Sequence, residues 1–328
     1  MQIKDIARLA EVAPSTVSRV LNGSGYVSAE VRSRVEKVIA DTGYVPNSIA
    51  KSLKAKKSRT IGVIIPRIAS FSMASVIEAV TRECEVAGYE VFLANTTLRV
   101  EKELSFLQAF ARRQIDGVVM MSVKITPEHV KLIESLDFPV VVVGQQYPGL
   151  CCVTHDDREV AEMVTSQLLS AGRQRVAMLN VSLDDNSVRG ERAQGYKDAL
   201  EKEGIPFLSE RVAYGDFTIS SGRQCMQEIW ERCPEKPDAV FCVSDRMAVG
   251  AVQYLKGIQV RIPEDCAVVG IGNDEISRFT YPSLSSVEYY YHEMGTKAAR
   301  LVLEGIERGK SPRGVWYIGY SLVRQESF

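Results

Sequence analysis

The sequence predicts a small helical N-terminal domain followed by a two-lobed α/β domain with parallel sheets. Three observations lead to this fold class. Basic residues outnumber acidic residues eleven to five up to residue 59, although the whole chain of 328 residues has a net charge of −1. From residue 60 onward, short apolar strands alternate with helix-length amphipathic segments. This alternating series runs twice along the chain, which predicts two similar lobes.

Composition limits the class of protein before any motif is considered. A chain of this length can hold two or three domains with a buried core. A net charge near zero gives no global attraction to nucleic acids or anionic membranes, so any nucleic-acid surface must be local. The seven cysteines are scattered, mostly in apolar runs, which predicts buried reduced thiols. No signal-peptide pattern and no apolar run near the length of a membrane span is present, so we expect a cytoplasmic protein.

The first 45 residues have the spacing of a helix-turn-helix domain. We expect a first helix over 3–9, a second over 14–21 after a turn, and a third that begins near Ser28 and ends near Asp41. In the second helix Val17, Val20 and Leu21 form the inward face. Short hydroxyl side chains on the outer face let a helix enter a major groove, and an arginine can bind a guanine edge, although a merely solvated face would have the same composition. The candidate DNA contacts are Pro14, Ser15, Thr16, Ser18 and Arg19.

Residues 46–59 are predicted to form a short helix and a linker. Pro46 ends the preceding helix, Asn47 can cap a new one, and Ala50 and Leu53 lie on one face at helical spacing. A helix of two turns is marginal alone, because nucleation is costly. We therefore expect it to form when it packs against a partner or binds DNA, with Asn47, Ala50 and Leu53 in the DNA-binding set.

The two lobes are expected to contain parallel sheets covered by helices, because their strands are almost continuously apolar. Two such lobes leave a cleft between them, where small ligands usually bind. The predicted strands are 60–65, 91–94, 117–121, 140–143, 176–181, 239–243 and 267–271, with a strand-like segment at 319–323. The predicted helices are about 73–87, 100–113, 127–136, 190–202, 220–231 and 247–256.

The chain resembles the LacI/GalR family of bacterial repressors. The resemblance rests on Ile-Lys-Asp-Ile-Ala from residue 3, Ser-Thr-Val-Ser-Arg-Val-Leu-Asn from residue 15, and Gly-Tyr-Val-Pro-Asn-Ser-Ile-Ala-Lys-Ser-Leu from residue 43. It implies that Pro14 and Ser15 read bases, that Arg19 contacts a base, and that Leu53 wedges into the minor groove. Where relatives often have a hydroxyl cap, this chain has Gln2 and Ala13. The implied domains are 1–45, 46–59 and 60–328, in a homodimer bound to a pseudo-palindromic operator on double-stranded DNA.

By the same resemblance, the C-terminal part is similar to periplasmic sugar-binding proteins and holds an effector between its lobes. A carboxylate and an arginine can hydrogen-bond vicinal hydroxyls, and an aromatic face can pack on a sugar. Structural alternatives stay open, since Asp245 could cap a helix, Arg192 could form a surface ion pair and Phe217 could belong to the core. The implied effector residues are Asp157, Arg192, Phe217, Ser244 and Asp245.

Two departures from the family pattern concern charge. Arg67 follows the first strand directly, and Gly272 with Asn273 stands where an acidic residue is usual. We therefore add Arg67 and Asn273 to the effector site and expect a phosphorylated sugar, because arginine matches phosphate well. Both departures resemble trehalose repressors, whereas the segments 143–147 and 155–157 resemble sucrose- and fructoside-operon repressors of Gram-positive bacteria. The sequence does not decide between them.

Enzymatic function is not expected. The chain has no P-loop, no Gly-x-Ser-x-Gly and no His-Glu-x-x-His, and its Gly-x-Gly at 270–272 lacks the rest of a dinucleotide fingerprint. With only three histidines, a metal or histidine-based catalytic site is not expected, and no cofactor is predicted. We expect a repressor that its sugar effector releases from DNA. The alternatives are an effector that acts as a corepressor and a sugar-binding protein without a DNA role.

Overall fold

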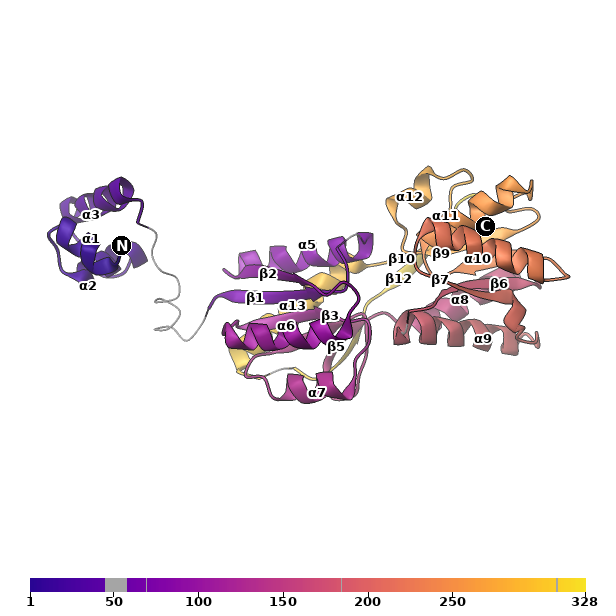
Figure 1. Ribbon diagram of the computed structural model, residues 1–328, viewed down its shortest axis with the longest axis horizontal. Coiled ribbons are helices and arrows are strands. Elements are labelled where there is room, and N and C mark those ends of the chain that lie inside the picture. Colours follow the sequence, from indigo (N-terminus) through magenta and orange to yellow (C-terminus); the bar gives the residue numbers. More distant parts are fainter. Residues whose placement is uncertain (45–57, 69, 184, 311) are drawn as a thin grey trace. The chain divides into compact units, whose positions relative to one another are not determined.

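The computed structural model describes residues 1–44, 58–68, 70–183, 185–310 and 312–328 (Figure 1). The chain separates into two compact units, Met1–Ser58 and Arg59–Phe328, and each is described by itself. The predicted short helix with Asn47, Ala50 and Leu53 lies outside the described residues.

The first unit contains three helices in its described residues: α1 (Ile3–Leu9), α2 (Pro14–Asn22) and α3 (Ala29–Thr42). They meet at a small apolar core in which Ile6 and Val17 are fully buried. The chain begins α2 without a side-chain cap, and Pro14 at the first helical position suits this start because it has no N–H to satisfy. This is the predicted helix-turn-helix order.

Helix α1 begins without a hydroxyl cap, whereas α3 begins with one. Gln2 supplies no hydroxyl, but its backbone N–H donates to Asp5 Oδ2 at 2.8 Å. Ser28 begins α3 in the usual way, because its Oγ accepts from the Val31 N–H at 3.4 Å. Asp5 therefore satisfies the Gln2 N–H at the start of α1, a different group from the one that a hydroxyl cap would satisfy.

The second unit contains two lobes, each with a central sheet. In the first lobe the strands lie in the order β11-β5-β4-β3-β1-β2 and all neighbours pair in parallel. The strands are β1 (Thr60–Ile65), β2 (Glu90–Asn95), β3 (Gly117–Met121), β4 (Val140–Val143), β5 (Cys151–Thr154) and β11 (Gly314–Tyr317). The helices are α5 (Phe71–Val86), α6 (Val100–Arg112), α7 (Pro127–Glu134) and α13 (Tyr291–Arg308).

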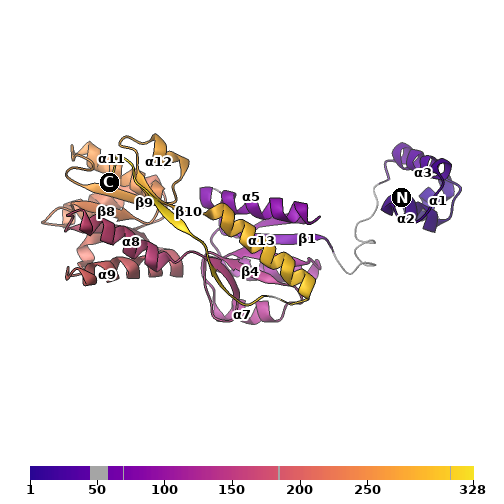
Figure 2. The same cartoon turned by 180° about the vertical axis from the view of Figure 1, so that it is seen from behind.

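Strand β1 is buried along its whole length because both of its faces are covered. Ile61 and Val63 join the core beneath α5 and α13, which lie side by side on one face of the sheet (Figure 2). Ile64 joins the opposite core, beneath α6 and α7. A side chain at Gly62 would lie 2.5 Å from the Phe110 ring, so this position admits only glycine unless α6 moves.

In the second lobe the strands lie in the order β12-β10-β9-β8-β6-β7, and only β12 is antiparallel to its neighbour among the described pairs. The strands are β6 (Val176–Val181), β7 (Val212–Gly215), β8 (Ala239–Cys242), β9 (Ala267–Ile271), β10 (Ser285–Tyr289) and β12 (Tyr320–Val323). The helices are α8 (Asp157–Ser170), α9 (Arg192–Lys202), α10 (Ile219–Arg232), α11 (Asp245–Gly257) and α12 (Glu275–Phe279). A π-helical turn, Asn186–Glu191, precedes α9, and a 3-10 turn, Ser209–Arg211, precedes β7.

The chain passes between the two lobes three times. It leaves the first lobe after β5, returns to it after β10, and leaves it again between β11 and β12. The crossing segments are joined to one another, since the Ile318 N–H donates to the Thr154 carbonyl at 2.8 Å and the Tyr290 N–H donates to the Gly319 carbonyl at 3.3 Å. These three segments are the covalent connection about which the lobes can move.

The sequence prediction of a two-lobed α/β domain with parallel sheets is confirmed. Strands 60–65, 117–121, 140–143, 176–181 and 267–271 agree at both ends. The prediction does not include β5, β7, β10, β11, α8, α12 or α13. It places the lobes one after the other, whereas α13 and β11 return to the first lobe. All seven cysteines are buried free thiols, as predicted.

Candidate ligand site and DNA-binding surface

The outer face of α2 carries the residues predicted to contact DNA. Pro14, Ser15 and Arg19 are exposed, whereas Thr16 and Ser18 are half-buried. Ser18 Oγ accepts from Asn22 Nδ2 at 3.2 Å, which occupies part of its hydrogen-bonding capacity. The opposite side of the helix holds the buried Val17 and Val20.

Two neighbouring residues belong to the same surface although sequence reasoning did not select them. Gly25 has a positive φ of 71°, and a side chain there would lie 3.4 Å from the Arg19 side chain. Tyr26 follows it and is 90% exposed. The Tyr26 ring is therefore accessible, one residue after the position that contacts Arg19.

In the second unit, the carboxyl ends of the strands of both lobes contribute contacts that cross from one lobe to the other. Gln145, after β4, donates from Nε2 to Asp185 Oδ1 at 2.9 Å. Ser187 donates from Oγ to the Gly144 carbonyl at 2.9 Å. The Arg67 guanidinium, after β1, lies 4.7 Å from the centroid of the Phe217 ring, after β7. We call these contacting residues the interlobe surface.

Asp157 and Arg192 form a buried ion pair in the second lobe. Each is 7% exposed, and Arg192 Nε donates to Asp157 Oδ1 at 2.7 Å. Arg192 also donates to the Val243 carbonyl at 2.6 Å, and the Tyr289 hydroxyl donates to Asp157 Oδ1 at 2.8 Å. Burial alone would lower the pKa of Arg192. The attraction to Asp157 is stronger than this effect, so the pKa of Arg192 is raised above its usual value. The two residues predicted for sugar binding are thus brought together.

An aromatic cluster surrounds this pair at two of the crossing segments. His155 stacks on Tyr289 with ring centroids 3.9 Å apart, and Tyr291 meets both rings edge-on at 5.8 Å. Burial, with a smaller contribution from Arg192, lowers the pKa of His155 to about 4 despite the nearby Asp157. His155 is therefore neutral near pH 7. Sequence reasoning selected neither His155 nor the two tyrosines, although three consecutive tyrosines, 289–291, stand at the end of β10.

Ser244, Asp245 and Asn273 have protein partners of their own. Ser244 Oγ caps α11 by accepting from the Met247 N–H, and Asp245 accepts from Ser286 Oγ at 2.5 Å and the Asp274 N–H at 2.7 Å. Burial raises the pKa of Asp245 to about 7. Asn273 has a positive φ of 45°, its N–H donates to Ser286 Oγ at 3.0 Å, and its Oδ1 accepts from Ser277 Oγ at 3.3 Å. These contacts fix the turn between β9 and α12.

Phe217 lies in a strained turn. Its φ is +68°, which residues with a side chain rarely adopt, and this turn precedes α10. The ring is half-buried, and the Arg67 guanidinium lies over one face of it. The structure therefore brings Arg67 and Phe217 together across the interlobe surface, which sequence reasoning did not foresee.

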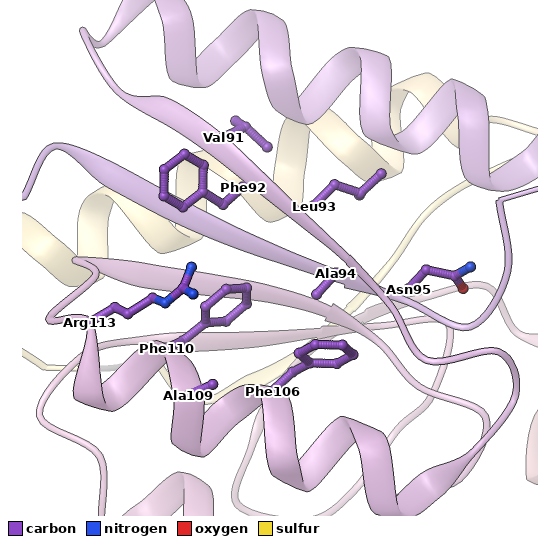
Figure 3. Close-up of a pocket in the computed structure, with 9 residues that line it drawn as sticks. All are labelled: Val91, Phe92, Leu93, Ala94, Asn95, Phe106, Ala109, Phe110 and Arg113. Atoms are coloured by element: carbon purple, nitrogen blue, oxygen red, sulfur yellow. The ribbon is translucent and has the colours of Figure 1, made fainter.

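A separate pocket of about 470 Å³ lies between β2 and α6 of the first lobe (Figure 3). Its lining is apolar apart from Asn95 and Arg113, and it includes none of the predicted effector residues. The pocket offers few of the converging hydrogen-bonding groups that a polar ligand needs, whereas the Asp157–Arg192 region has several.

A helix-turn-helix unit joined to a two-lobed α/β unit with a polar, charged interlobe surface defines a DNA-binding regulator with a ligand-sensing module. Residues 2–47 match the model "Bacterial regulatory proteins, lacI family", and residues 165–328 match "Periplasmic binding protein-like domain". The chain belongs to the LacI family of bacterial transcription regulators, and it is a regulator rather than an enzyme.

Relatives and a solved structure cover nearly the whole chain. Catabolite control protein A of Priestia megaterium is 32% identical over 92% of this chain and 91% of its own. The transcriptional repressor PurR of Vibrio atlanticus (strain LGP32) is 31% identical over 99% and 98%. The transcriptional regulator CelR–cellobiose complex has a TM-score of 0.76 at 28% identity and covers both chains completely. These names do not single out a sucrose- or fructoside-operon repressor. In the described part of the chain, no helix has the length and apolar character needed to cross a membrane.

Proposed function

We propose that the protein is a repressor of carbohydrate-utilisation genes that a sugar or sugar phosphate bound between its lobes releases from operator DNA. The observation that carries the proposal is the buried Asp157–Arg192 pair, which offers charged hydrogen-bonding groups beside the aromatic rings of His155 and Tyr289. Support comes from CelR, whose complex contains cellobiose, and from the repressor named among the relatives. Sucrose, fructose and trehalose compounds are the first candidates, because the sequence resembles the repressors of those operons.

The proposed coupling uses the crossing segments. A ligand changes DNA affinity only through its different affinities for two lobe arrangements. His155, Tyr289 and Tyr291 lie on or beside two of the three segments that connect the lobes, and Tyr289 contacts Asp157 directly. A ligand at Asp157 and Arg192 would therefore act on the connection itself, and the segment around Leu53, for which the sequence predicts a short helix, would respond to the movement of the first lobe.

A homodimer is part of the proposal, since two helix-turn-helix units are needed to read a pseudo-palindrome. Strand β2 lies at the edge of the first-lobe sheet and exposes Phe92 and Leu93 at 45% and 48%. Phe92 and Leu93 also line the apolar pocket beside α6 (Figure 3). An exposed apolar edge strand invites pairing with a second chain, which favours this edge as the dimer contact.

The proposal is tested by isolating DNA duplexes that the protein binds from a random pool, and then measuring the binding of one selected duplex by fluorescence anisotropy. Fructose, sucrose, trehalose, cellobiose and the available 6-phosphates are added in turn. We expect one of them to weaken DNA binding by about tenfold or more, the usual size of an allosteric coupling. Tighter DNA binding would identify a corepressor instead. Arg19→Ala should abolish sequence preference, whereas unchanged preference in this variant would contradict the role of α2.

A further inference from the structure

We propose that Gly25 is a positioning residue for base reading: because Gly25 has no side chain, the Arg19 side chain lies along the turn that follows α2, and this contact holds the guanidinium in place for a base edge. The inference rests on the proposed function, since it takes Arg19 as a base-contacting residue of α2. It deepens that function, because it adds to the DNA-binding surface a residue that acts through Arg19.

The end of α2 turns the chain back towards Arg19. Gly23 follows Asn22, the last residue of the helix, and adopts the left-handed region with a φ of 59°. The Gly23 N–H donates to the Val20 carbonyl at 3.3 Å, and the Ser24 N–H donates to the Arg19 carbonyl at 3.1 Å. These two hydrogen bonds form a Schellman motif, which reverses the chain at the end of a helix. The residues after Ser24 are consequently brought back beside Arg19.

Gly25 lies against the stem of the Arg19 side chain. A side chain at Gly25 would begin 3.4 Å from Arg19 Cδ, 3.7 Å from Nε and 3.8 Å from Cγ. Gly25 also has a positive φ of 71°, which glycine adopts without steric cost. The missing side chain thus lets the turn close on the arginine. Any atoms beyond a Cβ at this position would have to share the space of the arginine stem.

The turn that carries Gly25 is anchored at both ends. The Schellman hydrogen bonds fix its start to α2. At its end, Val27 packs on the core of the unit, and Ser28 caps α3. Gly25 and Tyr26 lie between these anchors and are exposed, so the contact with Arg19 is on the solvent side of the unit. An anchored backbone gives the arginine stem a fixed surface to lie on.

The guanidinium of Arg19 has no acidic partner in the described part of this unit. Two ion pairs are formed among these residues, Arg8 with Asp5 and Arg32 with Glu36, and neither includes Arg19. Arg19 is also exposed. The contact with Gly25 therefore supports the stem without neutralising the charged group, which suits a residue that binds an external acceptor.

Support of the stem matters because a long side chain is costly to order. Immobilising one such side chain on binding lowers affinity by about 2- to 10-fold. A stem that already lies on the turn has lost part of this freedom before DNA binds. Bidentate recognition of a guanine edge also requires a fixed guanidinium plane. We therefore expect Gly25 to contribute to affinity and to base discrimination, in both cases through Arg19.

The test compares matched substitutions at Gly25 and Gly23 in the full-length protein. Both glycines have a positive φ, but a side chain at Gly23 would meet nothing within 4 Å, which makes Gly23 the control. Asparagine and aspartate are introduced at each position, because they tolerate the left-handed region better than most residues. Every variant is made in the parent and in Arg19→Ala. Fluorescence anisotropy gives the Kd for the selected duplex and for a scrambled duplex, at a temperature at which circular dichroism shows each variant to be folded.

Two graded effects are expected at Gly25. Gly25→Asn should crowd the arginine stem and weaken binding of the selected duplex about 3- to 10-fold relative to Gly23→Asn. Gly25→Asp should weaken it about 10- to 100-fold relative to Gly23→Asp, because its carboxylate can pair with the guanidinium and occupy it. Binding of the scrambled duplex should change similarly in the two aspartate variants, since both add the same charge near DNA. In Arg19→Ala, the difference between the two positions should fall to within about twofold.

The outcomes separate this inference from the proposed function. Equal Kd values of the Gly25 and Gly23 variants for the selected duplex, in a protein whose sequence preference depends on Arg19, would overturn the positioning role alone. A difference between the positions that persists in Arg19→Ala would also overturn it, because Gly25 would then act without the arginine. Sequence preference that survives Arg19→Ala would contradict the proposed role of α2 and the positioning role with it. A parent that selects no duplex would contradict both.

Discussion

Asp157 Oδ1 accepts hydrogen bonds from Arg192 and Tyr289, and all three residues are buried. Sequence reasoning selected Asp157 and Arg192 separately, through resemblance. It did not foresee their contact, because 35 positions separate them and only the meeting of α8 with α9 brings them together. The same limit applies to Arg67 and Phe217, whose contact depends on how the two lobes meet.

Removing one member of the Asp157–Arg192 pair should destabilise the protein strongly. In Arg192→Gln the Asp157 carboxylate stays buried without its cation, which costs about 3–5 kcal/mol of unfolding free energy. Urea denaturation followed by circular dichroism measures the change. Arg158→Gln is the control, because the Arg158 side chain is 52% exposed in its pair with Asp198, and its effect should be far smaller. Equal effects of the two variants would contradict the structural role of the buried pair.

Asp245 should make stability depend on pH in a defined direction. Burial raises its pKa from 3.8 to about 7 in the folded protein, so the folded state holds this proton more tightly than the unfolded state. The associated stability is complete below pH 4 and is lost as pH rises towards 7, by up to about 4 kcal/mol at ~1.4 kcal/mol per pKa unit. Urea denaturation at several pH values should show the parent losing stability relative to Asp245→Asn over this window. A constant difference between the two proteins would contradict the prediction.

His155 should act in the opposite direction over almost the same window. Its pKa falls from 6.5 to about 4 in the folded protein, so the folded state prefers the neutral ring and the associated stability is lost as pH falls below 6.5. The effects of Asp245 and His155 therefore partly cancel in the parent protein. His155→Gln should lose less stability than the parent between pH 7 and pH 4.5 in the same denaturation series. A parent and variant that lose stability equally would exclude a neutral buried His155.

Elements were predicted best where local pattern alone defines them. Strands such as 117–121 and 176–181 are continuous apolar runs buried on both faces, so their ends coincide with the change in composition. The helix predicted over 190–202 is preceded by a π-helical turn, Asn186–Glu191, that periodicity does not reveal. β5, with Cys151 and Cys152, and α8 were missed although Asp156, which caps α8, is a helix-start signal.

The packing of α10 on α11 depends on glycines. A side chain at Gly250 would lie 2.1 Å from the Ile219 carbonyl oxygen, and one at Gly222 would lie 2.2 Å from the Met247 carbonyl oxygen. Gly250→Ala should therefore force the helices apart and cost about 1–3 kcal/mol of unfolding free energy. Gly257→Ala, at the end of α11 with open space around it, is the control and should be neutral or slightly stabilising. Thermal unfolding compares them, and equal melting temperatures would contradict the close packing.

At the scale of the whole molecule, the sequence predicts two lobes but not how the chain connects them. The three crossings place α13 and β11 in the first lobe, although they follow β6 to β10 of the second lobe in the chain. This return depends on long-range pairing, such as that of Val315 with Cys152, two residues that lie far apart in the sequence. Periodicity read along one segment contains no information about such a partner.

The proposed dimer gives a prediction at this scale. Leu93→Lys places a charge on the exposed edge strand β2 and should convert the dimer to a monomer, because apolar contact area is lost and two charges are brought together. Analytical ultracentrifugation at several concentrations measures the mass. Val86→Lys, an exposed apolar position at the end of α5, is the control and should stay dimeric. A parent protein that is already monomeric would contradict the proposed dimer.

The central claim is that a ligand at the interlobe surface controls DNA binding. The most direct measurement is the Kd for a selected operator duplex, with and without the tightest-binding sugar compound, in the parent protein and in Arg67→Gln and Leu53→Ala. The account predicts that the ligand raises the parent's Kd about tenfold or more, that Arg67→Gln binds DNA normally but responds much less to the ligand, and that Leu53→Ala binds DNA weakly while its ligand affinity is unchanged. An operator Kd that no ligand changes, or equal loss of both activities in each variant, would contradict it.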